Sequence, residues 1–123
     1  MDLKNPDGTG SLRITRISID ADSTSIDFEG QVEGYGTVFA THLLQPLDSE
    51  QTRGTSNGDA QTFLLDGSCL NTPHQGTFTS QGSSIQIYFT DAVDNGAVNF
   101  VIWDVNILSK DVDVKYWEIK PAD

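Results

Sequence analysis

The segment Asp27-Phe-Glu-Gly-Gln-Val-Glu-Gly-Tyr-Gly-Thr-Val-Phe-Ala-Thr-His-Leu-Leu44 carries the strongest fold signal in this chain. Two runs of strand-forming residues, Ser25–Val32 and Thr37–Leu44, flank a turn at Gly34-Tyr35-Gly36. A further glycine, Gly30, lies inside the first run, where a glycine usually marks a bend or a bulge. Strongly coiled sheets need glycines at such positions. The segment therefore predicts a bent β-hairpin that begins to close a barrel.

Signals for tight turns recur along the rest of the chain. Four dipeptides of the Asn-Gly or Asp-Gly type supply the positive φ angles of hairpin turns, and they are Asp7-Gly8, Asn57-Gly58, Asp66-Gly67 and Asn95-Gly96. A further hairpin is predicted about Gln81-Gly82, and no segment has helical periodicity over three turns. The pattern predicts an all-β chain with one antiparallel meander, closed into a barrel of about eight strands. A two-sheet β-sandwich is the alternative.

Two predicted strands change their apolar phase midway. In Ser11–Asp20 the change predicts a bulge near Thr15-Arg16. This bulge would bring the apolar side chains of the strand to one side, namely Leu12, Ile14, Ile17 and Ile19. In Val112–Ile119 the change lies between Tyr116 and Trp117 and again predicts a bulge. Two bulges favour a curved or closed sheet over a flat one.

Several segments are expected to lie outside the strands. Pro46–Asp59 is polar and contains Asn57-Gly58, so it predicts a loop long enough to act as a lid or to remain mobile. The short segment Ala60–Leu65 follows it as a strand. Asn71-Thr-Pro-His74 is predicted to be a turn, and residues 1–10 are predicted to form a loose arm.

Composition restricts the class of protein. A length of 123 residues predicts one domain over residues 1–123. Seven basic and eighteen acidic residues give a net charge of −11, which disfavours nucleic acids and anionic membranes as partners. A single cysteine, Cys69, excludes an intramolecular disulfide and a zinc cluster built on thiolates. No signal peptide or apolar membrane span is visible, so we expect a cytoplasmic protein.

The predicted strand Ala97–Leu108 is apolar on both faces. The alternating residues are Val98, Phe100 and Ile102 on one face, and Val101, Trp103, Val105 and Ile107 on the other. One face packs in the core, so the second face needs a cover. We expect this cover to be the N-terminal arm or another subunit. The second possibility predicts a homo-oligomer that forms through Ala97–Leu108.

With the strands placed, the segment Phe28-Glu-Gly-Gln-Val-Glu-Gly-Tyr-Gly-Thr-Val38 resembles the opening hairpin of small bacterial proteins with the allene-oxide-cyclase-like barrel fold. These barrels are similar in architecture to lipocalins. The resemblance covers about residues 14–41. It implies an eight-stranded antiparallel barrel, often oligomeric, with an internal cavity. It carries over no catalytic residue, because the chain does not align with the active site of the plant cyclase.

The two histidines offer few catalytic or metal-binding options. Cys69 and His74 lie five residues apart, but no helix N-terminus or nucleophile elbow is visible to activate the thiol, so we interpret Cys69 as structural. His42 and His74 lack the spacing of a metal motif. Asp91–Gly96 lacks the cadence of a calcium loop. We therefore predict no catalytic residue, no metal site and no cofactor.

The functional element that the sequence predicts is a pocket, since the lumen or mouth of a closed barrel is its usual ligand site. The candidate ligand-binding residues are Tyr35, His42, Tyr88, Trp103 and Asp104. Each has a structural alternative. His42 would be a core histidine bonded to a backbone carbonyl, Tyr35 and Tyr88 would pack on the surface, and Trp103 would fill a subunit interface.

Three functions are compatible with these observations. The first is binding of a small apolar or amphipathic ligand inside the barrel. The second is a self-assembling interaction or structural module without a ligand. The third is an isomerase or cyclase acting on a lipid-like substrate, which rests on the resemblance alone. We favour a protein that is not an enzyme.

Overall fold

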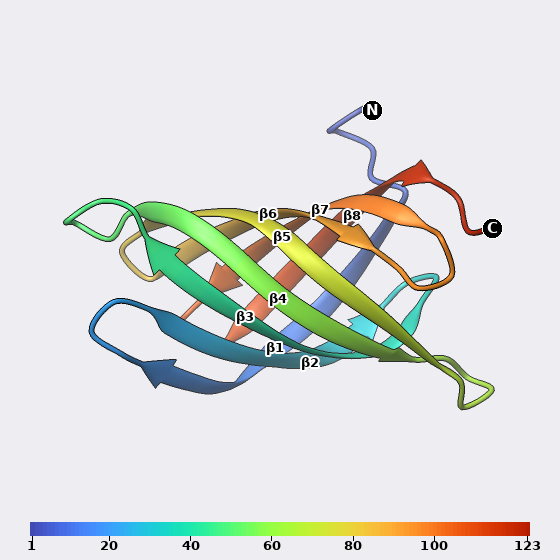
Figure 1. Ribbon diagram of the computed structural model, residues 1–123, viewed down its shortest axis with the longest axis horizontal. Coiled ribbons are helices and arrows are strands. Elements are labelled where there is room, and N and C mark those ends of the chain that lie inside the picture. The colour runs from blue at the N-terminus through green and yellow to red at the C-terminus, as the bar shows by residue number, and fades with distance from the viewer.

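Eight antiparallel strands form one closed barrel in the computed structural model, which describes residues 1–123 (Figure 1). Consecutive strands pair in sequence order, and β1 pairs with β8 to close the barrel. The strands are β1 (Gly8–Ile19), β2 (Thr24–Val32), β3 (Gly36–Pro46), β4 (Arg53–Phe63), β5 (Cys69–Gln81), β6 (Ser84–Ala92), β7 (Val98–Asn106) and β8 (Asp111–Lys120). The predicted eight-stranded barrel is confirmed, and the sandwich alternative is excluded. No helix in the structure has the length and apolar character needed to cross a membrane.

The two ends of the barrel carry different turns (Figure 1). One end holds the β2–β3, β4–β5 and β6–β7 turns, at residues 33–35, 64–68 and 93–97, together with both chain termini. We call this end the mouth. The other four turns lie at the opposite end.

The β2–β3 hairpin forms at the predicted glycine-rich turn. Gly34 and Gly36 have φ angles of 81° and 137°, which strongly favour glycine. Gly30 lies directly opposite Leu12 of β1, and a Cβ added at Gly30 would lie 2.7 Å from the Cα of Leu12. The missing side chain therefore lets β1 and β2 approach closely, as expected for a strongly coiled sheet.

The predicted bulge in β1 is confirmed, because the β1–β2 register shifts between Ile14 and Arg16. Leu12 and Ile14 are buried in the lumen. Ile17 lies near the end of the barrel and is only partly covered, whereas Ile19 is 79% exposed. Ile17 and Ile19 pair with Ile26 and Thr24 and so share the inner face with Leu12 and Ile14, as predicted, but Ile19 is exposed because it lies at the last position before the turn.

The phase change in β8 has a different cause from the one predicted. No register shift lies between Tyr116 and Trp117. The β7–β8 ladder shifts at Val98–Asn99 and leaves Ile119 of β8 unpaired, so the irregularity of β8 lies two residues beyond Trp117. Trp117 lies on the outer face, where its Nε1 donates a 2.8 Å hydrogen bond to the carbonyl oxygen of Asp2. The N-terminal arm thus covers Trp117, which packs against Phe100 of the doubly apolar strand at a ring-centroid distance of 5.9 Å.

The prediction that Pro46–Asp59 is a loop is wrong over most of its length. Only residues 47–52 connect β3 to β4, and β4 includes both Asn57-Gly58 and the first residues of the predicted strand Ala60–Leu65. Asn57-Gly58 is therefore not a turn. Its glycine instead has a packing role at the candidate site.

The prediction of a turn at Asn71–His74 is also wrong, because these residues belong to β5. Pro73 pairs with Asp59 of β4. The β5–β6 ladder begins only at His74, so no ladder on that side requires an N–H from Pro73. The proline is therefore tolerated inside a long strand.

The lumen of the barrel is mostly filled by side chains. All eight strands contribute to a cluster of sixteen buried hydrophobic residues, whose largest members include Phe28 and Trp103. The rings of these two residues make an edge-to-face contact with centroids 4.9 Å apart. A small cavity remains at the mouth, where the candidate site lies.

Candidate functional site

One cross-strand row of inward-facing residues brings together the polar groups of the site. Directly paired residues in an antiparallel sheet share a face. The paired row runs through five consecutive strands as His42 (β3), Gly58 (β4), His74 (β5), Asp91 (β6) and Asn99 (β7). The row therefore places two histidines, a carboxylate and an amide next to one another on the inner face of the sheet.

The two histidines form a buried hydrogen-bonded chain with a serine. Nδ1 of His42 lies 2.8 Å from Oγ of Ser56, and Nε2 of His42 lies 2.8 Å from Nδ1 of His74. All three side chains are buried. The chain therefore leads from the interior of the barrel to the Nε2 atom of His74.

Gly58 makes room for this chain. It lies between His42 and His74 in the row, and a Cβ at this position would lie 2.7 Å from Cδ2 and 2.9 Å from Cγ of the His42 ring. With no side chain on β4 at this level, the His42 ring lies over Gly58 and contacts a residue two strands away. The glycine is therefore required for packing rather than for a turn.

Burial keeps both histidines neutral. It lowers the pKa of His42 from 6.5 to about 3. Burial also lowers the pKa of His74 to about 2, and the nearby His42 acts in the same direction. A neutral imidazole has one donor and one acceptor nitrogen. The hydrogen-bonded series Ser56–His42–His74 can therefore hold its protons in two arrangements. Nε2 of His74, which has no partner in the protein, is a donor in one arrangement and an acceptor in the other.

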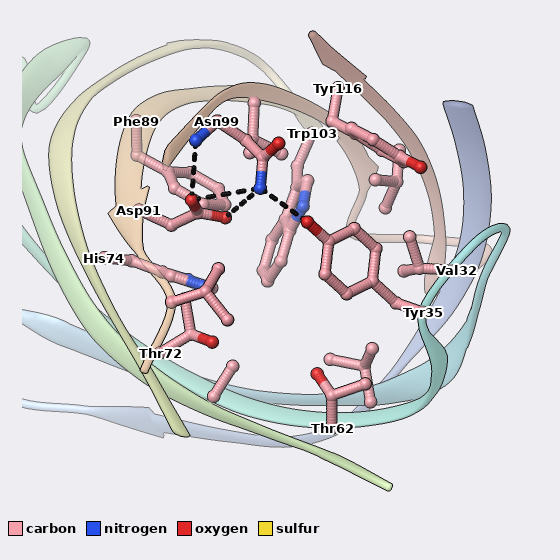
Figure 2. Close-up of a pocket in the computed structure, with 15 residues that line it drawn as sticks. Val32, Tyr35, Thr62, Thr72, His74, Phe89, Asp91, Asn99, Trp103 and Tyr116 are labelled. Atoms are coloured by element: carbon pink, nitrogen blue, oxygen red, sulfur yellow. Dashed lines mark hydrogen bonds between the residues drawn. The ribbon is translucent and has the colours of Figure 1, made fainter. Parts of the chain in front are cut away.

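His74 faces a cavity of about 50 Å³ at the mouth of the barrel (Figure 2). Ten of its fifteen lining residues are hydrophobic, including Phe89 and Trp103 from the core and Tyr35 and Tyr116 near the rim. The polar lining residues are Thr62, Thr72, His74, Asp91 and Asn99. In Figure 2 the ring of His74 points into this cavity.

A second polar network borders the same cavity. The backbone N–H of Asn99 donates to Oδ1 of Asp91 at 2.8 Å, and its Nδ2 donates to the Asp91 carboxylate at 3.2 and 3.3 Å. The same Nδ2 atom donates to the hydroxyl oxygen of Tyr35 at 2.9 Å. These bonds fix the orientation of the amide, because a reversed amide would place its oxygen against the carboxylate.

Asn99 is left with an unpaired acceptor. Its Oδ1 is the one fully enclosed side-chain nitrogen or oxygen in the chain without a hydrogen-bond partner, and the residue is only 1% exposed. Because buried polar atoms are almost always paired, such an atom calls for an explanation. No hydrogen bond joins the Asn99 network to His74, so the cavity separates two sets of groups with unused bonding capacity.

Burial also changes the acidity of the other groups around the cavity. It raises the pKa of Asp91, while the hydrogen bonds from Asn99 oppose this rise. Burial raises the pKa of Tyr35 as well, against the hydrogen bond from Asn99. The pKa of Tyr116 is raised by burial first, and then by Tyr35 and the negative charges of Glu33, Asp7 and Glu118.

The structure separates the five predicted ligand-binding residues into three groups. Tyr35 and Trp103 line the cavity. His42 does not reach the cavity but lies directly behind His74, bonded to side chains rather than to the expected backbone carbonyl. Tyr88 and Asp104 lie away from the cavity, where Gln86 accepts from Tyr88 at 2.6 Å and donates to Asp104 at 2.8 Å.

All five polar residues of the cavity were absent from the predicted set: Thr62, Thr72, His74, Asp91 and Asn99. A signal for Asn99 was present, because it alternates with Val101 and Trp103 as the single polar residue on that apolar face. His74 was hidden by the predicted turn. Cys69 and His74 are separated by an odd number of positions in one strand, so their side chains lie on opposite faces and cannot form a nucleophile–base pair.

Comparisons with known proteins do not assign this site. No protein-family model, no curated protein and no solved structure matches the chain. The resemblance to allene-oxide-cyclase-like barrels stays an expectation. No group of three or more histidine, cysteine or carboxylate side chains is placed to share a metal ion.

The neutral histidines predict a loss of stability in acid. Below pH 6.5 the unfolded chain binds protons at both histidines, whereas the folded chain does not until the pH approaches 3. Each histidine should therefore reduce the free energy of unfolding by about 2 kcal/mol between pH 6.5 and pH 5. Urea unfolding at these two pH values measures the effect.

The matched variant is His74→Gln, which retains all the carboxylates, including Asp91, and removes one buried imidazole. Its free energy of unfolding should fall by about 2 kcal/mol less than that of the wild type over the same pH range. Equal pH dependence in the two proteins would contradict a neutral, buried His74.

Gly58→Ala should destabilise the barrel by about 1–3 kcal/mol, because the new methyl group overlaps the His42 ring and forces it to move. The added Cβ also contacts the backbone carbonyl of Thr41, whether or not the His42 ring is present. A double-mutant cycle with His42→Ala, followed by urea unfolding, separates the two contacts. If Gly58→Ala costs as much without the His42 ring as with it, the ring does not need the space at Gly58.

Proposed function

We propose that this protein binds a small amphipathic molecule whose polar end enters the mouth cavity. The observation that carries the proposal is the ring nitrogen Nε2 of His74, which has no partner in the protein and faces a cavity with mainly apolar walls (Figure 2). Leaving a buried polar group unpaired costs about 1–3 kcal/mol. A ligand that supplies a hydrogen-bond partner for Nε2 of His74 recovers this free energy on binding.

The size of the cavity restricts the ligand. A cavity of about 50 Å³ has room for only a few water-sized groups, since a single water requires about 10–15 Å³ of cavity. A lipid chain does not fit inside the filled lumen. The rest of a longer ligand would lie across the rim, where Tyr35, Leu64 and Leu65 border a shallow surface. Leu65 is fully exposed there and offers an apolar contact.

Binding is favoured over proton-transfer catalysis by the chemistry of the histidine chain. An efficient general base has a pKa near the working pH, whereas the pKa of His74 is about 2. Ser56 does not act as a nucleophile towards a ligand in the cavity, because it is fully buried behind His42. The isomerase or cyclase alternative therefore rests only on the resemblance in the opening hairpin.

A self-assembling module has less support than the binding role. Trp103, a candidate for a subunit interface, is 3% exposed within its own chain and packs in the lumen. The N-terminal arm covers part of the second face of this region by bonding to Trp117. A homo-oligomer formed through Ala97–Leu108 stays a prediction without a specific contact to support it.

The binding role predicts local NMR shift changes with small probes. Butan-1-ol, phenol, butylammonium and butyrate, added separately to ¹⁵N-labelled protein, cover neutral, cationic and anionic polar ends. At least one probe should shift the amide signals of Tyr35, His74 and Asn99 and the indole N–H of Trp103, with saturation at millimolar concentration. The indole signal of Trp117, outside the barrel, should not move.

A pair of neighbouring variants controls this test. Ala60→Val fills space in the cavity and should weaken binding, whereas Gln61→Val places the same side chain on the outer face of the same strand and should not. If no probe shifts the cavity signals, or if both variants bind equally well, the proposed binding site is wrong.

A further inference from the structure

We infer that the mouth cavity selects organic ammonium cations, so that the polar end of the ligand is a protonated amine. This inference rests on the proposed binding function and narrows it to one chemical class. Three features of the cavity support it: a carboxylate without a cationic partner, aromatic walls and a neutral acceptor atom, Nε2 of His74.

The carboxylate is that of Asp91, which is half-buried and lines the cavity. The chain has two ion pairs, Arg16–Asp27 and Lys120–Asp123, so Asp91 has no cationic partner. No lysine or arginine lines the cavity. Asn99 stabilises the negative charge with neutral donors only. A cationic group on a ligand would supply the opposite charge that the protein does not provide.

Aromatic rings form two sides of the cavity. Tyr35 and Tyr116 make an edge-to-face pair with centroids 5.4 Å apart. Phe89 stacks on His74 at 4.2 Å and meets Trp103 at 5.1 Å in an edge-to-face contact. Ammonium groups are attracted to the faces of aromatic rings, most strongly where water is excluded. The combination of these rings with one carboxylate is suited to a cation and has no equivalent advantage for a neutral alcohol.

The histidine chain can provide an acceptor for an ammonium N–H. When Nδ1 of His74 donates to Nε2 of His42, and Nδ1 of His42 donates to Oγ of Ser56, the Nε2 atom of His74 presents its lone pair to the cavity. A primary ammonium group has three N–H donors. The available acceptors are therefore the Asp91 carboxylate and Nε2 of His74.

The surroundings of the mouth favour entry of a cation. The charges of Glu33, Asp7 and Glu118 act on Tyr116 at the rim. The whole chain carries a net charge of −11. Such a field attracts cations and repels anions during encounter. A carboxylate ligand would meet both this field and Asp91, so the cavity excludes fatty acids on the basis of charge as well as size.

Matched four-carbon probes test this selectivity. Dissociation constants for butylammonium, butan-1-ol and butyrate are measured by NMR titration at about pH 7 and low salt, near 20 mM NaCl. Butylammonium should bind at least about tenfold more tightly than butan-1-ol, and butyrate should show no saturable binding. Raising the salt to about 200 mM should weaken butylammonium binding and leave butan-1-ol binding unchanged.

Asp91→Asn is the decisive variant, because it removes the charge and keeps an oxygen that accepts from the backbone N–H of Asn99. It should abolish the preference for butylammonium over butan-1-ol. Asp104→Asn, which removes a carboxylate outside the cavity, should leave the preference intact. The comparison of the three probes in the wild type decides the question even if Asp91→Asn does not fold.

The outcomes separate this inference from the proposed function. If butan-1-ol binds at the cavity as tightly as butylammonium, or if Asp91→Asn keeps the preference, cation selectivity is wrong and the binding role survives. If no probe saturates the cavity signals, the proposed function itself fails.

Discussion

The hydrogen bond between Nε2 of His42 and Nδ1 of His74 is the contact on which the candidate site depends. It joins β3 to β5 across β4 inside the barrel, and it requires that β4 carry no side chain at that level. Gly58 meets this requirement. Because both rings are buried, neither is charged near neutral pH, and the bond joins two neutral imidazoles. His74 is thereby oriented towards the cavity with one ring nitrogen left free.

The packing of the lumen explains why the site lies where it does. Core side chains centred on Phe28 and Trp103 fill most of the barrel interior, so the space left over is small and lies at the mouth. The Ser56–His42–His74 network and the Asp91–Asn99–Tyr35 network both border this space. No hydrogen bond joins the two networks. An interior that is otherwise well packed thus retains unpaired polar atoms only beside a cavity, which is the arrangement expected of a ligand site rather than of a purely structural core.

Much of the fold was predictable from local signals. The Gly34-Tyr35-Gly36 turn gave the β2–β3 hairpin, and the phase change in β1 gave its bulge, because both depend on residues close in sequence. The errors arose where a local signal has a tertiary cause. Asn57-Gly58 has the composition of a turn, but its glycine accommodates a ring from another strand. Pro73 has the character of a strand breaker, yet it lies where one neighbouring ladder has not begun.

The candidate site was predictable only in part for the same reason. Alternation along β7 places Asn99 on the face of Trp103, so its presence in the lumen was accessible from sequence. The approach of His42 to His74 was not accessible, since it depends on the register of three strands. Alternation also places Tyr88 and Asp104 on the outer face of the barrel. They therefore cannot contact a ligand in the cavity, although their polar groups are suited to one.

The most direct test of this account is a search for the hydrogen bond between the two histidines in ¹⁵N-histidine-labelled protein. We expect a nitrogen–nitrogen scalar coupling across the hydrogen bond between Nε2 of His42 and Nδ1 of His74, with ring nitrogen shifts typical of neutral imidazoles from about pH 8 down to about pH 5. Two histidines that show no such coupling and titrate independently near pH 6.5 would contradict the buried chain and the site built on it.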